Sequence, residues 1–313
     1  MKVYINRKPV SGPWGGGNGF VDRLQEHLRL DGYEVSYDLN DNDIDVIFCF
    51  DPRFNLGVSY ADLLQYKQQY GVRIVQRVGD LGTHSKPELT QLLLNVAQHS
   101  DFLIFPSEWA KSVLDRLCPY ELPRSIVIPN KPRRIFYKHR QQKPRNGESF
   151  KIVTHHWSTN SLKGFDFYRA LDESLPDGCK FTYIGRLPTG FSFKNADHLG
   201  VMNDEELIKE LPKHDLYLTA SQLEAGANHV LEAMACGLPV VCRDNGGSVN
   251  EYCRGQGLEF SDISSMLGVV KTIRNDFQMY WDQAIDREHD SLEKDVVPRY
   301  VSWCKIAKND ETC

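Results

Sequence analysis

The sequence has no long apolar run. In its 313 residues no stretch approaches the roughly 18 apolar residues that a membrane-spanning helix needs, and MKVYINRKPV at the N-terminus has no apolar run behind its lysine. These absences argue against a transmembrane segment and a secretion signal. We therefore expect a cytoplasmic protein.

An excess of positive charge is also missing. The chain carries 37 Lys and Arg residues against 42 Asp and Glu residues, a formal net charge of -5. A nucleic-acid partner favours a basic surface, so we expect none. One basic stretch, residues 131–145, departs from this average. It is either a solvated interdomain connector, the simpler interpretation, or a contact for an anionic acceptor or a membrane surface.

Metal and disulfide patterns are absent too. The eight cysteines include no CxxC pair and no Cys/His cluster at zinc spacing, so we expect reduced thiols that mostly pack in the core. The segment DNDIDV, residues 41–46, contains Asp-x-Asp twice. It precedes a strand at the amino end, away from the end where parallel sheets bind ligands. We interpret it as a surface turn and predict no metal site.

The pattern that is present is an alternation of strands and helices, which restarts after the polar segment 138–149. It predicts two αβ domains, each with a parallel sheet covered by helices on both faces. We place the domains at 1–143 and 144–296. Residues 262–308 predict a charged helical tail that Pro298 kinks or breaks. The predicted strands are 2–6, 45–50, 73–78, 101–107 and 125–130, then 151–156, 181–186, 216–221, 238–243 and 258–260.

Ligands of such sheets bind beyond the carboxyl ends of the strands, so the cleft between two domains is the default site. The first loop there, 11–20, is rich in glycine. Unless it is simply a flexible loop, Gly15, Gly16 and Gly17 let a ligand approach the main chain, beside a helix start that favours anions. Phe20 stands where a dinucleotide fingerprint needs glycine, and no P-loop motif is present. Nicotinamide enzymes and P-loop ATPases therefore lose support.

Two further strand ends carry polar groups. Asp80 and His84, in the loop 79–84, are placed to hydrogen-bond a sugar or to act in acid/base chemistry, unless they are a solvated loop pair. Lys163, in the loop 155–165, is suited to neutralise phosphate oxygens. The adjacent His155 and His156 point to opposite sides of their strand, so at most one faces the cleft.

Two glutamates, Glu224 and Glu232, flank the start of a helix that we expect from about 226–228 to 236. Eight residues at helical rise span about 12 Å, which suits a ligand with a diphosphate in its middle and hydroxyls at both ends. If the helix were solvated, the two glutamates would be ordinary surface residues without a function. This helix is otherwise apolar, however, so Glu232 needs a partner. We interpret the two carboxylates as groups that hold hydroxyls of a nucleotide sugar.

With these motifs the chain resembles the retaining GT-B glycosyltransferases of glycosyltransferase family 4. The resemblance covers nearly the whole chain. Its most specific part is the Glu-x7-Glu pair together with the Gly-x-Pro segment that follows it. The segments that carry it are Glu224 to Glu232, Gly237 with Pro239, 244–253 and Lys163-Gly164, together with 15–17, 105–114 and 127–136.

The resemblance implies a GT-B fold of two Rossmann-like domains facing across a deep cleft, with the C-terminal helix, about 297–313, docked back on the first domain. It also implies transfer of a sugar from a UDP- or GDP-sugar donor to a hydroxyl of a glycan or glycoconjugate acceptor. The anomeric configuration is retained, and neither a metal nor another cofactor takes part.

The resemblance further implies residue roles. Glu224 contacts the donor sugar, Glu232 the ribose and Lys163 the diphosphate, with Asp80 or His84 near the sugar. Gly15, Gly16 and Gly17 approach the phosphates from the other domain. Ser158 stands where the family commonly has arginine, so Arg186 or a histidine shares the phosphate charge. The family's usual aromatic residue and glycine after the first glutamate are replaced in the donor-binding loop, which here consists of Gly226, Ala227, Asn228 and His229.

Two other classes share this architecture. A nucleotide-sugar epimerase would isomerise the sugar of the donor alone. A catalytically inactive sugar-nucleotide binding module would bind the donor without transferring or hydrolysing it. Fold analogy does not choose among the three.

Overall fold

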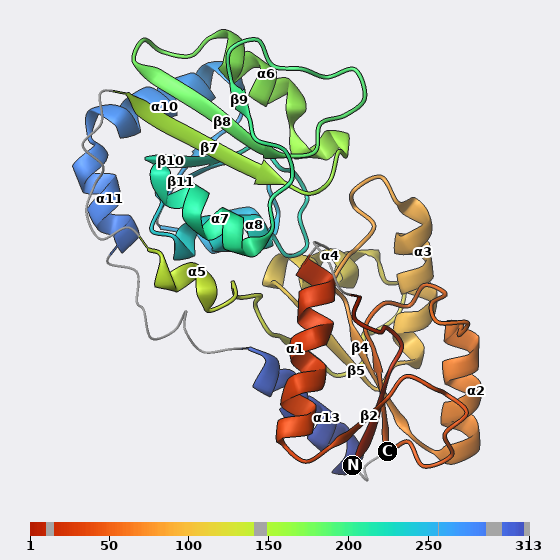
Figure 1. Cartoon of the computed structure of the whole chain (residues 1–313). Coiled ribbons are helices and arrows are strands. Elements are labelled where there is room, and N and C mark those ends of the chain that lie inside the picture. Colours follow the sequence, from red (N-terminus) through yellow and green to blue (C-terminus); the bar gives the residue numbers. More distant parts are fainter. Residues whose placement is uncertain (11–15, 141–148, 256, 286–295, 310–313) are drawn as a thin grey trace. The chain divides into compact units, whose positions relative to one another are not determined.

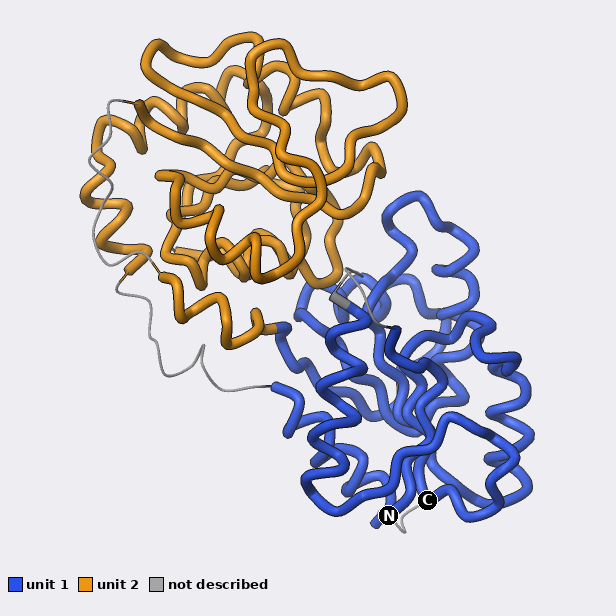
Figure 2. The backbone as a smooth tube through the Cα atoms, in the orientation of Figure 1, with its two compact units in different colours: residues 1–130, 296–313 blue, residues 131–295 orange. Residues whose placement is uncertain are grey.

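The computed structural model describes residues 1–10, 16–140, 149–255, 257–285 and 296–309 (Figure 1). The chain forms two compact units (Figure 2). Unit 1 combines Met1–Asn130 with Val296–Cys313, and unit 2 is Lys131–Asp295. The predicted boundary at 143 lies outside the described residues. Within those residues, no helix combines the length and apolar character needed to cross a membrane.

Unit 1 contains a six-stranded parallel sheet in the order β2-β1-β3-β4-β5-β6. All five strands predicted for the first half of the chain form. The additional strand β2 escaped prediction because it is short and half polar, with the sequence Glu-Val-Ser at the sheet edge. The strands are β1 (Lys2–Ile5), β2 (Glu34–Ser36), β3 (Val46–Cys49), β4 (Arg73–Arg77), β5 (Phe102–Phe105) and β6 (Ser125–Val127).

The C-terminal helix α13 (Val297–Asn309) packs in unit 1 against α1 (Gly16–Leu30). Tyr300 lies edge-on to Phe20, with ring centroids 4.8 Å apart. Pro298 is the second residue of α13, where its missing N–H would have no acceptor in any case. The other helices of unit 1 are α2 (Tyr60–Tyr70), α3 (Pro87–Val96), η1 (Ala97–His99) and α4 (Glu108–Leu117).

The segment 41–46 lies at the amino end of this sheet, as predicted for a surface turn. Lys2 Nζ lies 2.7 Å from Asp43 Oδ1 and 3.6 Å from Asp41 Oδ2. The Lys2 main-chain N–H donates to Asp45 Oδ2 over 2.7 Å. The three carboxylates are thus held by Lys2 and fasten the loop to the start of β1.

Unit 2 contains a second six-stranded parallel sheet, in the order β12-β11-β10-β7-β8-β9. The five predicted strands form, and only the two-residue strand β9 was missed. The strands are β7 (Phe150–His156), β8 (Cys179–Gly185), β9 (Asp197–His198), β10 (Leu216–Thr219), β11 (Val240–Arg243) and β12 (Gly257–Phe260). The helices are α5 (Ile135–Lys138), η2 (Ser161–Lys163), α6 (Phe165–Glu173), α7 (Asp204–Glu210), η3 (Leu211–Lys213), α8 (Asn228–Ala235), α9 (Ser248–Cys253), α10 (Ile263–Asn275) and α11 (Phe277–Ile285).

Part of the basic stretch 131–145 is built into unit 2. Phe136 and Tyr137 are buried in the apolar cluster beneath α8. Arg133 forms an ion pair with Asp204 at the start of α7. Arg140 Nη2 donates to the carbonyl oxygen of Ala284 over 2.8 Å. Phe136, Tyr137 and Arg140 of this stretch are therefore packed within unit 2, and the expectation of a solvated connector is wrong for them.

The strand order of unit 2 reverses beside β7. The chain first continues to β8 and β9 on one side, then crosses to β10 and its neighbours on the other. A reversal of this kind opens a crevice at the carboxyl ends of the two strands, where αβ proteins bind their ligands. The loops after β7 and β10 are therefore the place to look for a site.

Candidate functional site

The carboxyl ends of β7 and β10 carry a cluster of polar side chains in unit 2. Strand β7 ends in His155 and His156, both buried, and β10 ends at Thr219. Glu224 follows β10 in the connecting loop, and Glu232 lies on α8. The structure thus gathers most of the polar groups predicted for the second domain at one edge of its sheet.

Lys163 is held at this edge by a tight turn. The Asn160 side chain accepts a hydrogen bond from the Leu162 N–H over 2.9 Å and caps η2. Gly164 follows with φ 82°. A Cβ on Gly164 would lie 2.4 Å from the Cβ of Ala220, at the end of β10. Only glycine therefore allows the turn to lie against β10, and Lys163 is left 8% exposed.

Glu224 is held in an extended segment by the loop after β11. Its N–H donates to the Gly246 carbonyl over 3.0 Å, and its carbonyl accepts from the Ser248 N–H over 2.8 Å. The side chain points to Lys163, whose Nζ donates to Glu224 Oε1. Both side chains are largely buried, so this is an interior ion pair. It joins the loop after β10 to the turn after β7.

Glu232 has the partner that the apolar character of its helix requires. His155 Nε2 donates to Glu232 Oε2 over 2.9 Å. Helix α8 begins at Asn228 and ends at Ala235, as the sequence predicted. The two glutamates are therefore each engaged by a nitrogen of the β7 end, Glu224 by Lys163 and Glu232 by His155.

A third histidine, His229, completes the cluster. Its Nδ1 lies 3.0 Å from the Tyr217 hydroxyl, and its Nε2 lies 3.6 Å from Glu224 Oε1. The contact with Glu224 is longer than a hydrogen bond, and His229 Nε2 is buried without a hydrogen-bond partner in the described chain. The ring centroid lies 4.8 Å from that of His156, whose Nε2 is 2.6 Å from the Tyr168 hydroxyl.

The histidines inside the cluster are poor bases. Burial, helped by the nearby His229 and Lys163, lowers the pKa of His156 well below its ordinary value. Burial lowers the pKa of His229 to about 4, although the neighbouring Glu224 opposes the shift. Both rings are therefore neutral at neutral pH. Lys163 and Glu224 form the ion pair of the cluster.

The other residues predicted for the donor site of unit 2 lie around this cluster. Ser158 Oγ accepts from the Asn160 N–H over 3.2 Å. Arg186 is exposed, and its guanidinium carbon lies 4.2 Å above the Trp157 ring centroid. Gly226, Ala227 and Asn228 lead from Glu224 into α8, and the Ala227 N–H donates to Ser248 Oγ over 3.1 Å.

The remaining predicted residues belong to unit 1. Gly16 and Gly17 open α1, and Gly15 lies outside the described residues. Asp80 forms a 2.7 Å ion pair with Lys86. Burial raises the pKa of Asp80, but Lys86 and the Gly82 N–H outweigh it and hold the pKa below its ordinary value. His84 lies in the same loop, and its catalytic role stays a prediction together with that of Asp80.

Sequence reasoning missed Tyr168 and Tyr217, which hold the histidines. Tyr217 alternates with apolar residues in LYLT, and Tyr168 falls on the apolar face of α6, so both look like ordinary core residues. Their hydroxyl groups are the feature from which the sequence could have predicted these contacts. Such a group needs a hydrogen-bond partner when buried, and the strand next to Tyr217 ends in histidines.

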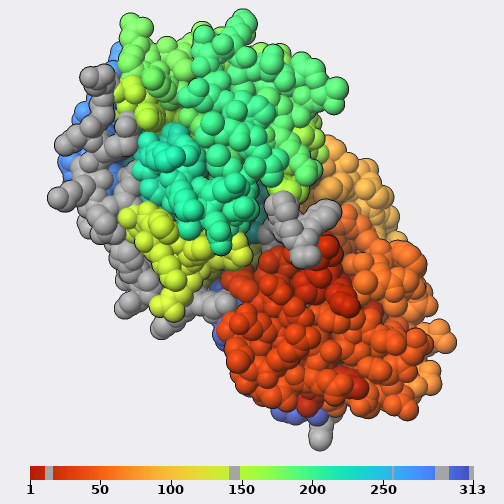
Figure 3. All heavy atoms as spheres, viewed as in Figure 1, coloured from red at the N-terminus to blue at the C-terminus, as the bar shows by residue number. Residues whose placement is uncertain are grey.

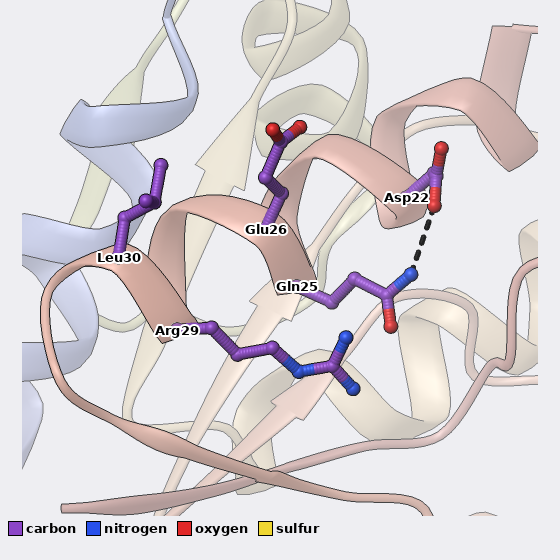
Figure 4. A pocket seen from close by; sticks show the side chains of 5 residues that line it. All are labelled: Asp22, Gln25, Glu26, Arg29 and Leu30. Carbon is purple, nitrogen blue, oxygen red and sulfur yellow. Dashed lines mark hydrogen bonds between the residues drawn. The ribbon is translucent and has the colours of Figure 1, made fainter.

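A surface hollow on α1 in unit 1 is unrelated to this cluster. Figure 4 shows its five side chains, all from one helix, with Gln25 Nε2 donating to Asp22 Oδ1 over 2.8 Å. Figure 3 shows this part of the chain at the surface, in red and orange. A single solvated helix face offers no converging polar groups. The lining residues are Asp22, Gln25, Glu26, Arg29 and Leu30.

Comparison with known proteins points in one direction. Residues 194–258, which include Glu224 and Glu232, match the family model described as "Glycosyl transferases group 1". No curated protein sequence matches the chain.

Three solved structures have the same fold along their whole length. Alr3699/HepE of Anabaena, in complex with UDP and glucose, is 14% identical, with 98% of this chain and 99% of that chain covered and a TM-score of 0.73. The sucrose-phosphate synthase tll1590 of Thermosynechococcus elongatus is 15% identical, with 98% and 96% covered and a TM-score of 0.65. WaaG, a glycosyltransferase involved in lipopolysaccharide biosynthesis, is 13% identical, with 99% and 100% covered and a TM-score of 0.68.

At these sequence identities the structural likeness shows the fold alone. The chain has the GT-B fold of glycosyltransferases, with two Rossmann-like units. Within that fold, the segment 194–258 is similar to the group 1 glycosyl transferases.

Proposed function

We propose that the chain is a retaining glycosyltransferase. It transfers a sugar from a UDP- or GDP-sugar to a hydroxyl of a glycan or glycoconjugate, without a metal ion. The observation that carries the proposal is the buried pair of Lys163 and Glu224 beside Glu232, at the carboxyl edge of the unit 2 sheet. The complex of the Anabaena protein with UDP and glucose supports UDP as the nucleotide.

The donor replaces contacts that the cluster makes within itself. Its diphosphate takes Lys163 as counter-ion and releases the Glu224 carboxylate, which then accepts hydrogen bonds from hydroxyls of the donor sugar. The phosphates lie beside the first turn of α8, where the positive end of the helix dipole favours them. Glu232, oriented by His155, accepts hydrogen bonds from the ribose hydroxyls.

The reaction builds charge at two places. The bond between the anomeric carbon and the diphosphate oxygen breaks, so negative charge grows on the leaving group and positive charge on the sugar ring. In this proposal Lys163 and the start of α8 stabilise the leaving group, so no metal cation is needed. The acceptor hydroxyl attacks from the same face and gives its proton to the departing phosphate, so the configuration is retained.

Glu224→Ala is the direct test. The variant should lose transfer and slow donor hydrolysis while keeping the circular dichroism and thermal unfolding of a folded protein. The matched control is Glu173→Ala, because Glu173 is an exposed glutamate of the same unit. Full activity of Glu224→Ala would refute the assigned role.

A screen with UDP-, GDP- and ADP-sugars identifies the nucleotide, since a bound donor raises the melting temperature by mass action. Incubation with the matching donor alone then separates the alternatives. Release of free nucleotide with an isomerised sugar would indicate an epimerase. Binding without transfer or hydrolysis would indicate an inactive binding module. The anomeric configuration of the product, read by NMR, tests retention.

A further inference from the structure

Three residues other than glycine adopt a left-handed backbone conformation within the part of the chain that the structure describes. Leu56 has a φ of 54°, Ser85 a φ of 58° and Leu223 a φ of 53°. Each lies in a loop between a strand and the next helix, after β3, β4 and β10 respectively. This conformation is costly for a residue that carries a Cβ, and strain of this kind is concentrated at functional sites. Leu223 directly precedes Glu224, so its strain lies at the candidate site.

The hydrogen bonds of the loop after β10 explain the conformation of Leu223. The Leu223 N–H donates to the carbonyl oxygen of Asn245 over 3.0 Å. The next N–H, that of Glu224, donates to the carbonyl oxygen of Gly246 over 3.0 Å. A regular extended chain directs successive N–H groups to opposite sides. Both bonds to the loop after β11 therefore form only because the backbone turns at Leu223.

The residue before this turn is joined to the turn that carries Lys163. The Gln222 N–H donates to the carbonyl oxygen of Leu162 over 2.9 Å. Leu162 directly precedes Lys163 in η2. The main chain is therefore fixed to the Lys163 turn on one side of Leu223 and to the loop after β11 on the other.

The turn at Leu223 decides which way the Glu224 side chain points. The Glu224 carboxylate pairs with Lys163 Nζ, while its main chain forms an isolated parallel bridge with Gly247. Local departures from regular strand pairing re-aim side chains beside active sites. With an extended backbone at position 223, the N–H and the side chain of Glu224 would rotate to the other side, away from Lys163.

We propose that Leu223 is a positioning residue whose left-handed backbone turns the Glu224 carboxylate toward Lys163. Glycine adopts this conformation without strain and asparagine at a lower cost than leucine, whereas the branched Cβ of valine opposes it. The backbone at position 223, rather than the leucine side chain, therefore determines whether the ion pair forms. The effect on sugar transfer rests on the proposed function, whereas the orientation of Glu224 does not.

Urea unfolding tests the orientation without an assay of activity. Lys163→Met should lower the urea midpoint of the unsubstituted chain, of Leu223→Gly and of Leu223→Asn by similar amounts. In Leu223→Val the same change should lower the midpoint by less than about half as much, because the ion pair is already broken. Leu56→Val is the matched control, since Leu56 has a φ of 54° in unit 1, and there Lys163→Met should keep its full effect. A full effect of Lys163→Met in Leu223→Val would overturn the proposal.

Transfer and UDP affinity test what the orientation does for the reaction. Leu223→Val should reduce transfer about tenfold or more, since Glu224 no longer accepts hydrogen bonds from the donor sugar, while the affinity for UDP should not fall. Leu223→Gly, Leu223→Asn and Leu56→Val should transfer at the rate of the unsubstituted chain. Activity kept by Leu223→Val and lost by Leu223→Gly would assign the role to the side chain and overturn the proposal. If the unsubstituted chain shows no transfer but the urea result is as expected, the proposed function fails and the positioning role stands.

Discussion

His155 Nε2 lies 2.9 Å from Glu232 Oε2, so the end of β7 and the middle of α8 are joined by a hydrogen bond to a carboxylate. The bond orients the glutamate that we assign to the ribose hydroxyls. It also explains why an acidic residue is tolerated on a helix whose other inward positions are apolar.

Glu232→Gln should weaken UDP binding by about tenfold or more, because hydrogen bonds to a charged group contribute about 1.5–3 kcal/mol. The loss should be small for 2′-deoxy-UDP, which lacks one of the hydroxyls. Calorimetric titration of both nucleotides with both proteins gives the comparison. Equal losses for the two nucleotides would separate Glu232 from the ribose, and Glu173→Gln serves as the control.

Lys163→Met should destabilise the fold strongly. It leaves the largely buried Glu224 carboxylate without its counter-ion, and removal of one partner of an interior ion pair costs about 3–5 kcal/mol. Lys163→Met combined with Glu224→Gln should recover part of this loss, because the uncompensated charge is gone. Urea unfolding measures all three proteins.

The exposed ion pair of Lys194 and Glu173, 2.7 Å apart, is the matched control for the variants of Lys163 and Glu224. Lys194→Met should cost no more than about 1 kcal/mol, as is usual for surface ion pairs. A double variant no more stable than Lys163→Met would contradict the assignment of the ion pair.

Acid should destabilise the protein in part through His229. Its pKa is about 4 in the folded chain against an ordinary 6.5. Between these values the unfolded chain binds a proton that the folded chain does not, so the free energy of unfolding falls as the pH is lowered. The slope reaches at most about 1.4 kcal/mol per pH unit for one group.

His229→Gln should therefore flatten the fall in stability between pH 6.5 and pH 4, measured by urea unfolding at several pH values. Some slope should remain, since burial lowers the pKa of His156 as well. The exposed His99 supplies the control variant His99→Gln, which should keep the slope of the unsubstituted protein. A His229→Gln variant with that same slope would contradict the prediction.

Gly164→Ala should reduce both stability and UDP affinity. The new Cβ would meet Ala220, and the turn that holds Lys163 would move away from β10. Gly190→Ala is the matched control, because Gly190 has a similar φ of 76° with no atom within 4 Å of the added Cβ. Gly190→Ala therefore measures the effect of backbone strain alone, without a clash that displaces the turn. UDP binding weakened equally in the two variants would show that the close approach to Ala220 has no role in placing Lys163.

The central strands were predictable because their signal is local and strong. Runs such as VIFC in β3 and LYLT in β10 are buried on both faces, and short turns bound them. Strands β2 and β9 were not predictable. They are three and two residues long at sheet edges, and pairing with a neighbour defines them more than their own composition does.

The candidate site was predictable where the positions of its residues relative to the predicted strands and helices place them at one sheet edge. Glu224, Glu232 and Lys163 follow strands or flank a helix start, so their common edge follows from parallel topology. Sequence alone did not reveal that His155 would hold Glu232 or that Tyr217 would hold His229. Such pairings depend on strand order, which brings β7 beside β10 although β8 and β9 lie between them in the chain.

Because α13 supplies Tyr300 and Val301 to the core of unit 1, that core is assembled from the two ends of the chain. On the ribosome, residues 1–130 emerge long before 296–309 are made. During that interval Phe20 and Phe48 lack the covering helix, while all of unit 2 is synthesised. Unit 1 therefore reaches its native state last, and a chain halted anywhere within unit 2 presents an open apolar face to chaperones and proteases.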